Sequence, residues 1–196
     1  MAKMIRAVII GFAHMHVNEI AQYIDEHPDY EIVGGADIPP ETPELTRARY
    51  TRNWNRDFVA KTCGVPLFDN YSTMLDSVKP DIAFIMCENI FKADVALECA
   101  KRGITVSIEK PMAMNLAEAV HIRDLIDKYG IEVFVNWPIA WRRWLYEMKA
   151  ALDSGVAGKL IKIYAAAGHT GPLGVGAKHR GVTDKAQTMT DEEREN

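Results

Sequence analysis

The sequence predicts an α/β protein with a Rossmann-type, doubly wound parallel sheet, followed by the beginning of an α+β substrate domain. Three observations support this prediction. Short apolar runs alternate with helical periodicity between residues 4 and 136. A glycine, Gly11, directly follows the first run, and an acidic residue, Asp37, ends the second. This order is typical of parallel strands whose sheet is covered by helices on both faces.

The first unit runs from Met4 to Asp37. Residues 5–10 are mostly apolar and β-branched, as expected for a buried parallel strand, and residues 17–24 have helical spacing. Residues 31–36 form the second predicted strand. A helix that begins directly after a strand points its free N–H groups and its positive dipole end at one place. The turn at Gly11 is therefore suited to binding an anion such as a pyrophosphate.

Asp37 predicts the type of dinucleotide. It lies about 20 residues after the glycine loop, where a carboxylate binds both hydroxyls of an adenosine ribose and repels a 2′-phosphate. The expected cofactor is therefore NAD, and NADP is disfavoured.

The loop itself departs from the G-x-G-x-x-G pattern, because Gly11, Ala13 and His16 occupy the three glycine positions. Ala13 adds a methyl group where phosphate approaches the backbone, and His16 adds a ring where helix and strand pack closely. The alternative interpretation is an ordinary first turn of an α/β domain.

Further strands and helices follow in the same alternation. The sequence predicts a possible short helix at 43–50, a helix at 54–63 ended by Gly64, an edge strand at 65–68, a helix at 72–78, a strand at 81–86, a helical stripe at 93–100, a strand at 104–108, a helix from the capping box of Asn115 and Glu118 to Tyr129, and a strand at 131–135.

Ligands of such sheets bind outside the carboxyl ends of the strands. Gly11, Asp37, Cys87–Asn89, Glu109–Pro111 and Asn136 all follow predicted strands. Their convergence at one edge is stronger evidence for a site than any single motif.

The chain divides into a predicted cofactor domain at 1–136, the start of a second domain at 137–167 and a tail at 168–196. Residues 141–153 are expected to form a helix, and residues 160–167 a half-exposed strand. The tail is rich in glycine and polar residues, so we expect it to be disordered.

Composition excludes several classes of protein. The hydrophobic content of 48% is ample for a core, and the net charge of −4 argues against a nucleic-acid partner. Three cysteines without C-x-x-C spacing indicate reduced thiols in the cytoplasm, and no apolar run is long enough to cross a membrane.

One tripeptide connects the chain to a known family. A Rossmann unit, then a strand ending in Glu109-Lys110-Pro111, then a capped helix resembles the Gfo/Idh/MocA family of glucose–fructose oxidoreductase and inositol dehydrogenase. Asn136 with the following aromatic helix, and then Gly158-Lys159-Leu160, resemble the family's crossing into its second domain. The resemblance covers residues 4 to about 167. It implies an NAD(P)-dependent oxidoreductase that acts on sugars, cyclitols or related polyols and forms a homo-oligomer through its second domain.

The resemblance also implies the site residues. Lys110 would be catalytic and lie beside the nicotinamide, where an amine can orient and help deprotonate an alcohol. Pro111 favours an extended conformation at Lys110, and Glu109 would orient the lysine. The expected cofactor-binding residues are Gly11, Phe12, Ala13, His14, His16, Asp37, Cys87, Asn89, Glu109, Lys110 and Asn136.

Two departures from the family concern the later part of the site. Where the family often has Thr-Pro-Asn and later a histidine, this chain has Cys87-Glu88-Asn89 and Lys92. Only Asn89 matches, and Glu88 is expected to point away from a pyrophosphate or to pair with Lys92. The family's later Asp-and-His segment has no counterpart, so the chain resembles a family member that is shortened in its second domain.

Three groups of residues have a second possible role. His14 and His16 could begin a zinc or iron site, but the sequence suggests no third ligand, so no metal is expected and a role in the cofactor or substrate pocket is favoured. Arg47, Arg49 and Arg52 are expected in a solvated loop rather than at the cofactor. The tryptophans at 137, 141 and 144 are expected in a core or an interface rather than stacked on a sugar.

Two other functions remain open at this point. One is a non-catalytic NAD-binding module that lacks a complete active site. The other is an interaction module whose exposed helix at 137–152 and strand at 160–167 pair with another chain.

Overall fold

The computed structural model describes residues 3–39 and 49–166. The predicted helix at 43–50 therefore falls almost wholly outside the described residues, as does the predicted tail at 168–196.

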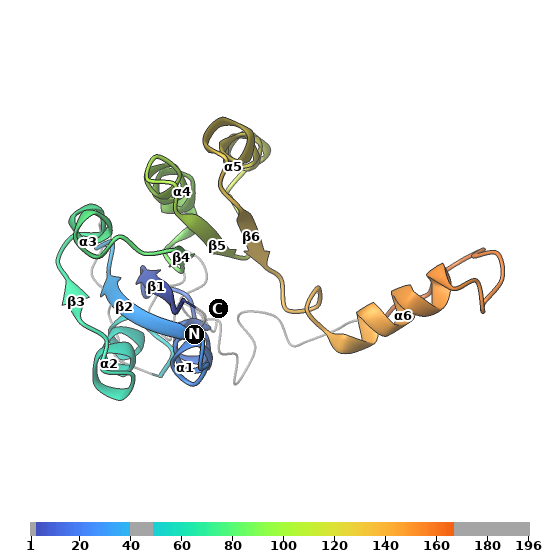
Figure 1. Cartoon of the computed structure of the whole chain (residues 1–196), viewed down its shortest axis with the longest axis horizontal. Coiled ribbons are helices and arrows are strands. Elements are labelled where there is room, and N and C mark those ends of the chain that lie inside the picture. Colours follow the sequence, from blue (N-terminus) through green and yellow to red (C-terminus); the bar gives the residue numbers. More distant parts are fainter. Residues whose placement is uncertain (1–2, 40–48, 167–196) are drawn as a thin grey trace, which may run out of the picture.

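Six strands form one parallel sheet in the order β3-β2-β1-β4-β5-β6 (Figure 1). The strands are β1 Ile5–Ile10, β2 Tyr30–Ala36, β3 Leu67–Phe68, β4 Ile82–Ile85, β5 Thr105–Glu109 and β6 Val133–Asn136. This order is that of the doubly wound dinucleotide-binding fold, in which the winding direction changes between β1 and β4. The sequence prediction of a Rossmann-type parallel sheet is confirmed.

Helices cover both faces of the sheet. They are α1 Val17–Asp25, α2 Arg52–Thr62, α3 Tyr71–Val78, the 3₁₀ turn η1 Asn89–Phe91, α4 Lys92–Ala100, α5 Leu116–Tyr129 and α6 Arg143–Asp153. In Figure 1, α1 and α2 lie on one face, and α3, α4 and α5 lie on the other. Each predicted helix over residues 54–129 is present with its ends shifted by a few residues at most.

The alternation of side chains along β1 divides the core between these two faces. Ala7 and Ile9 pack in the cluster with α1 and α2, whereas Val8 and Ile10 pack in the cluster with α3, α4 and α5. All four residues are fully buried. A strand that is apolar on both sides has to lie in the middle of a covered sheet, and β1 does.

The predicted capping box begins α5. The side chain of Asn115 accepts a hydrogen bond from the Glu118 amide (3.0 Å), and the Glu118 carboxylate accepts one from the Met114 amide (3.0 Å). Gly130 ends the helix with a φ of +67°. The first bond satisfies an amide that the first turn of a helix leaves without an intrahelical partner, and the second fixes the residue before the N-cap.

The beginning of the second domain differs from its prediction. The predicted strand at 160–167 is wrong over residues 160–166, which form no strand. A strand requires a neighbour that satisfies its backbone groups. These residues follow α6, which stands away from the sheet in Figure 1, and no described strand lies beside them.

Gly11 is the backbone position on which the edge of the sheet depends most. Its φ is +85°, and a Cβ atom there would lie 2.4 Å from the Cα atom of Cys87. A side chain at this position therefore meets both backbone strain and a clash with backbone.

We expect Gly11→Ala to reduce the free energy of unfolding by about 2–4 kcal/mol, because it adds left-handed strain and overpacking. Gly64→Ala is the matched control, since Gly64 has a φ of +66° but nothing within 4 Å of its Cβ position. The control variant should lose only the part of the unfolding free energy that is due to backbone strain, about 1–2 kcal/mol. Urea denaturation of both variants measures the difference, and equal losses would contradict the close approach at Gly11.

Candidate functional site

The residues predicted for the site follow the carboxyl ends of five parallel strands. Gly11 follows β1, Asp37 follows β2, Cys87 follows β4, and Asn136 is the last residue of β6. Lys110 directly follows β5. Since parallel strands end at the same edge of a sheet, the fold brings these positions to one edge.

The loop between β1 and α1 crosses the end of β4. The Gly11 amide donates to the Ala36 carbonyl (2.8 Å), and the His14 amide donates to the Met86 carbonyl (3.1 Å). Phe12, Ala13 and His14 are buried. The side chains of Phe12 and Ala13 therefore belong to the packing of the loop, and a ligand meets this part of it mainly through backbone.

Asn55 in α2 fixes this loop, and sequence reasoning missed it. Its Nδ2 atom donates to the carbonyls of Phe12 and His14, each at 3.0 Å, and the residue is fully buried. Asn55 satisfies two backbone acceptors of an irregular loop, which is otherwise expensive to bury. An asparagine inside a predicted helix gives no sequence signal for this role.

Asp37 lies at the end of β2 and is held by several donors. Its Oδ1 atom accepts hydrogen bonds from the amides of Phe12 (3.3 Å) and Ile38 (2.9 Å). The guanidinium of Arg52 pairs with the same oxygen and also donates to the Ile38 carbonyl (2.9 Å). No described residue donates to the Oδ2 atom, and the side chain of Asp37 is 19% exposed.

Arg52 corrects two sequence predictions. It is 4% exposed at the start of α2, so the prediction of a solvated arginine is wrong at this position. Arg49 is exposed and lies over the rings of Tyr50 and Trp54, whereas Arg47 is outside the described residues.

Arg52 also pairs with the buried Glu88, for which the sequence suggested Lys92 as partner. One guanidinium thus lies between two carboxyl groups.

A hollow of about 220 Å³ opens beside this cluster at the ends of β2 and β3. Its lining residues are Phe12, Asp37, Pro39, Asn53, Arg56, Leu67, Phe68 and Asp69.

Glu109 is the centre of the other half of the edge. It is fully buried, and its carboxylate accepts hydrogen bonds from the Lys110 amide (2.6 Å) and from Asn136 Nδ2 (3.2 Å). His16 Nδ1 contacts the same carboxylate at Oε1, and His14 Nδ1 lies 3.6 Å from that oxygen. Glu109 therefore joins the β1–α1 loop to the ends of β5 and β6.

The histidine pair thus has a third possible ligand that the sequence did not suggest. One ring nitrogen of His14, one of His16 and a carboxylate oxygen of Glu109 all lie within 4.8 Å of one another. Glu109 is 93 residues from His16 along the chain, so spacing alone could not reveal the cluster.

Lys92 is fully buried beneath this part of the site. Its Nζ atom donates to Asn89 Oδ1 (2.9 Å), to the Glu109 carbonyl (2.7 Å) and to the Pro111 carbonyl (2.8 Å). These three bonds use all the donors of an ammonium group. Lys92 therefore fixes the backbone on both sides of Lys110.

Lys110 itself is half-buried, and the Lys110–Pro111 peptide bond is cis. Its ammonium group makes no hydrogen bond to any residue in the described ranges, whereas its amide donates to Glu109. The lysine is thus anchored through its backbone, and its side chain remains available to a ligand.

Cys87 packs against Gly11 and is buried. Burial raises the pKa of its thiol to about 12, so the thiol is uncharged at neutral pH. Cys87 is therefore not an activated nucleophile, and all three cysteines are free.

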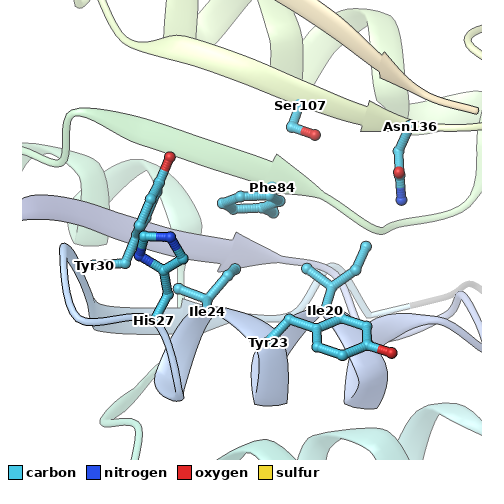
Figure 2. A pocket seen from close by; sticks show the side chains of 8 residues that line it. All are labelled: Ile20, Tyr23, Ile24, His27, Tyr30, Phe84, Ser107 and Asn136. Atoms are coloured by element: carbon cyan, nitrogen blue, oxygen red, sulfur yellow. The ribbon is translucent and has the colours of Figure 1, made fainter. Parts of the chain in front are cut away.

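Asn136 also borders a mostly apolar pocket of about 200 Å³ on the face of the sheet that α1 covers. Figure 2 shows Ile20, Tyr23 and Ile24 of α1 on one side of this pocket, with Phe84 and Ser107 of the sheet opposite. The lining includes one imidazole, that of His27, and no Asp, Glu, Lys or Arg side chain.

The aromatic residues after β6 are not in a core. Trp137, Trp141 and Trp144 are 50%, 54% and 54% exposed, and α6 has no buried residue. Among the described helices, none has the length and apolar character that a membrane span requires.

Comparison with known proteins agrees with this architecture. Residues 5–137 match the family model described as the oxidoreductase family GFO_IDH_MocA, NAD-binding Rossmann fold. The rhizopine catabolism protein MocA of Rhizobium meliloti is 25% identical over 101 residues, which cover 52% of this chain and 31% of that protein.

Two solved structures share the fold. The myo-inositol 2-dehydrogenase of Lactobacillus plantarum matches with a TM-score of 0.65 and 19% identity, covering 81% of this chain and 44% of that one. The scyllo-inositol dehydrogenase of Lactobacillus casei, solved with NAD(H) and scyllo-inositol, matches with a TM-score of 0.64 and 17% identity, covering 80% and 43%.

The chain thus spans less than half the length of these relatives. The family model nevertheless matches more than half of the chain. This protein therefore belongs to the Gfo/Idh/MocA family of oxidoreductases, and residues 5–137 match the family's NAD-binding Rossmann domain.

Proposed function

We propose that the chain supplies the cofactor site of an NAD-dependent oxidoreductase that moves hydride between nicotinamide and a sugar, cyclitol or related polyol. One observation carries the proposal. Direct contacts link Asp37, the β1–α1 loop and Lys110 along a single edge, where they would act as ribose acceptor, phosphate-binding loop and catalytic amine. Asp37 accepts from the Phe12 amide, His16 contacts Glu109, and Glu109 accepts from the Lys110 amide.

The adenosine would bind at the β2 end of this edge. Asp37 has one oxygen held by three donors, and its other oxygen is left for the ribose hydroxyls. The adjacent hollow of about 220 Å³ provides space for the nucleoside. The carboxylate of Asp37 opposes a 2′-phosphate, which favours NAD over NADP.

The pyrophosphate would lie over the β1–α1 loop, at the positive end of the α1 dipole. Ala13 has no room to contribute more than backbone, because it is buried. Among the described residues, the amides of Ala13 and Met15 are the loop amides that donate to no other group, so they are the ones left for an anion. The side chain of Asn89 already bonds to Lys92, and the Glu109 carboxylate already contacts His16 and Asn136. Asn89, Glu109 and Asn136 would therefore act mainly by holding neighbouring groups in position.

The nicotinamide would lie at the β5 end, beside Lys110. In the oxidation of an alcohol, the carbon gives a hydride to nicotinamide C4 and the hydroxyl gives a proton to a base. Lys110 would be the group that accepts this proton, and Lys92 fixes the backbone on both sides of it.

Similarity in fold to inositol dehydrogenases supports a hydroxylated substrate of the polyol type. The substrate contacts and a homo-oligomer would come from a second domain, which α6 and the exposed tryptophans before and within it would join. A non-catalytic NAD-binding module is the alternative, and turnover decides between the two.

Titration with NADH, followed by nicotinamide fluorescence, tests cofactor binding. We expect Asp37→Ala to weaken NADH binding about 10- to 100-fold, because charge-assisted hydrogen bonds to the ribose are lost. NADPH binding should weaken less, because the variant removes one of the carboxylates that pair with Arg52, and the positive charge of Arg52 then attracts the 2′-phosphate more strongly. Asp29→Ala, at the amino end of β2, is the matched control and should bind as the wild type does. Equal losses for the two cofactors would rule out the ribose contact.

Turnover of a polyol panel with NAD tests catalysis. We expect Lys110→Met to lower turnover at least about 100-fold while NADH still binds, because the base is lost and the cofactor contacts remain. Lys128→Met on the solvent side of α5 is the control and should leave turnover unchanged. Turnover that survives Lys110→Met would refute the assigned role, and binding without any turnover would favour the non-catalytic module.

A further inference from the structure

We propose that His14, His16 and Glu109 bind one divalent transition-metal ion, at the end of the edge where Lys110 lies. This inference goes beyond the proposed function, because neither cofactor binding nor hydride transfer requires a metal. Its starting point is the cluster of two imidazoles and one carboxylate whose ligand atoms lie within 4.8 Å of one another.

The spacing of the cluster suits a metal ion. Bonds of about 2.0–2.2 Å from zinc to nitrogen and oxygen, at tetrahedral angles, place ligand atoms about 3.3 Å apart. His14 Nδ1 and Glu109 Oε1 are already 3.6 Å apart. His16 lies closer to Glu109 and has to turn outward to admit the ion. It is free to do so, because its side chain is 17% exposed, whereas the other two are buried.

One existing bond competes with the ion. The His16 amide donates to His14 Nδ1 over 3.2 Å, which is long for a hydrogen bond. If His14 binds the metal through Nδ1, it gives up this contact and gains a coordinate bond in its place.

The charge of Glu109 is the second argument. The carboxylate is fully buried, and the two ion pairs that it makes among the described residues are with His14 and His16. The buried Lys92 ammonium bonds the Glu109 carbonyl rather than its carboxylate, and a buried carboxylate is unfavourable unless a cation is paired with it. A divalent cation held by the three side chains supplies that charge.

The surroundings of the carboxylate are also those of a metal ligand. Asn136 Nδ2 and the Lys110 amide both donate to it, and the Lys92 ammonium holds the Glu109 carbonyl. On the other side, Asn55 holds the carbonyls of Phe12 and His14. Such outer contacts orient ligands and raise metal affinity.

The donor set indicates the ion and its ligand. Two imidazoles and one carboxylate bind Zn²⁺ or Fe²⁺ and leave positions open for further ligands. At this end of the edge, an open position would take an oxygen of a hydroxylated molecule next to Lys110. The ion would polarise that hydroxyl as a Lewis acid.

Metal binding is measured on the full chain after dialysis against EDTA, with Zn²⁺ by calorimetry and with Co²⁺ by visible absorption. We expect one ion per chain, and His16→Asn and Glu109→Gln should each weaken binding at least about tenfold. Since His16 is partly exposed, His16→Asn tests the site even if Glu109→Gln fails to fold, which circular dichroism reports. In the control variant, the other four histidines, His27, His121, His169 and His179, are all replaced by Asn, and binding should not change.

Absence of binding at millimolar metal would overturn the proposal, as would wild-type affinity in His16→Asn or loss of binding in the four-histidine control. NADH titration of the metal-free protein separates this result from the proposed function. If NADH binds and the metal does not, the metal site alone is wrong.

Discussion

The close approach of the β1–α1 loop to the end of β4 is the constraint on which the site depends. Gly11 permits it, because any side chain there would collide with the backbone of Cys87. Once the loop crosses β4, the Phe12 amide reaches Asp37 and the His16 ring reaches Glu109. A loop that stood higher above the sheet would separate the two halves of the edge. The geometry of the proposed cofactor site thus depends on one backbone contact between the residues that follow β1 and β4.

Charged groups are concentrated at this edge even though it is largely buried. Arg52, Glu88, Lys92 and Glu109 are each less than 5% exposed. Buried charges contribute little net stability, because their desolvation offsets much of their mutual attraction. Four of them at one edge of a small domain are therefore better explained by a role in binding than by a role in folding. Each is held by donors or acceptors of neighbouring elements, so the edge is arranged before any ligand arrives.

The sequence predicts the fold well, because local patterns determine it. Apolar runs, helix caps and the glycine turn specify the strands and helices, which assemble into the parallel sheet. Gly11, Asp37 and Lys110 could be selected from the sequence because each follows a predicted strand. The internal contacts of the site could not be predicted. The bonds from Asn55 to the loop and the pairing of Arg52 with Glu88 join residues that are far apart in sequence. The strand expected at 160–167 failed for a related reason, since alternation alone does not supply a neighbouring strand.

The central claim is that one ligand lies along the carboxyl edge from Asp37 to Lys110. The most direct test is an NMR titration of ¹⁵N-labelled protein with NAD⁺. The account predicts that amide shifts change together in the 11–16 loop, at Ile38, at Asn89 and at Lys110. Changes confined to the opposite edge, where Asp29 and Asp81 lie, or no change at millimolar NAD⁺, would contradict it.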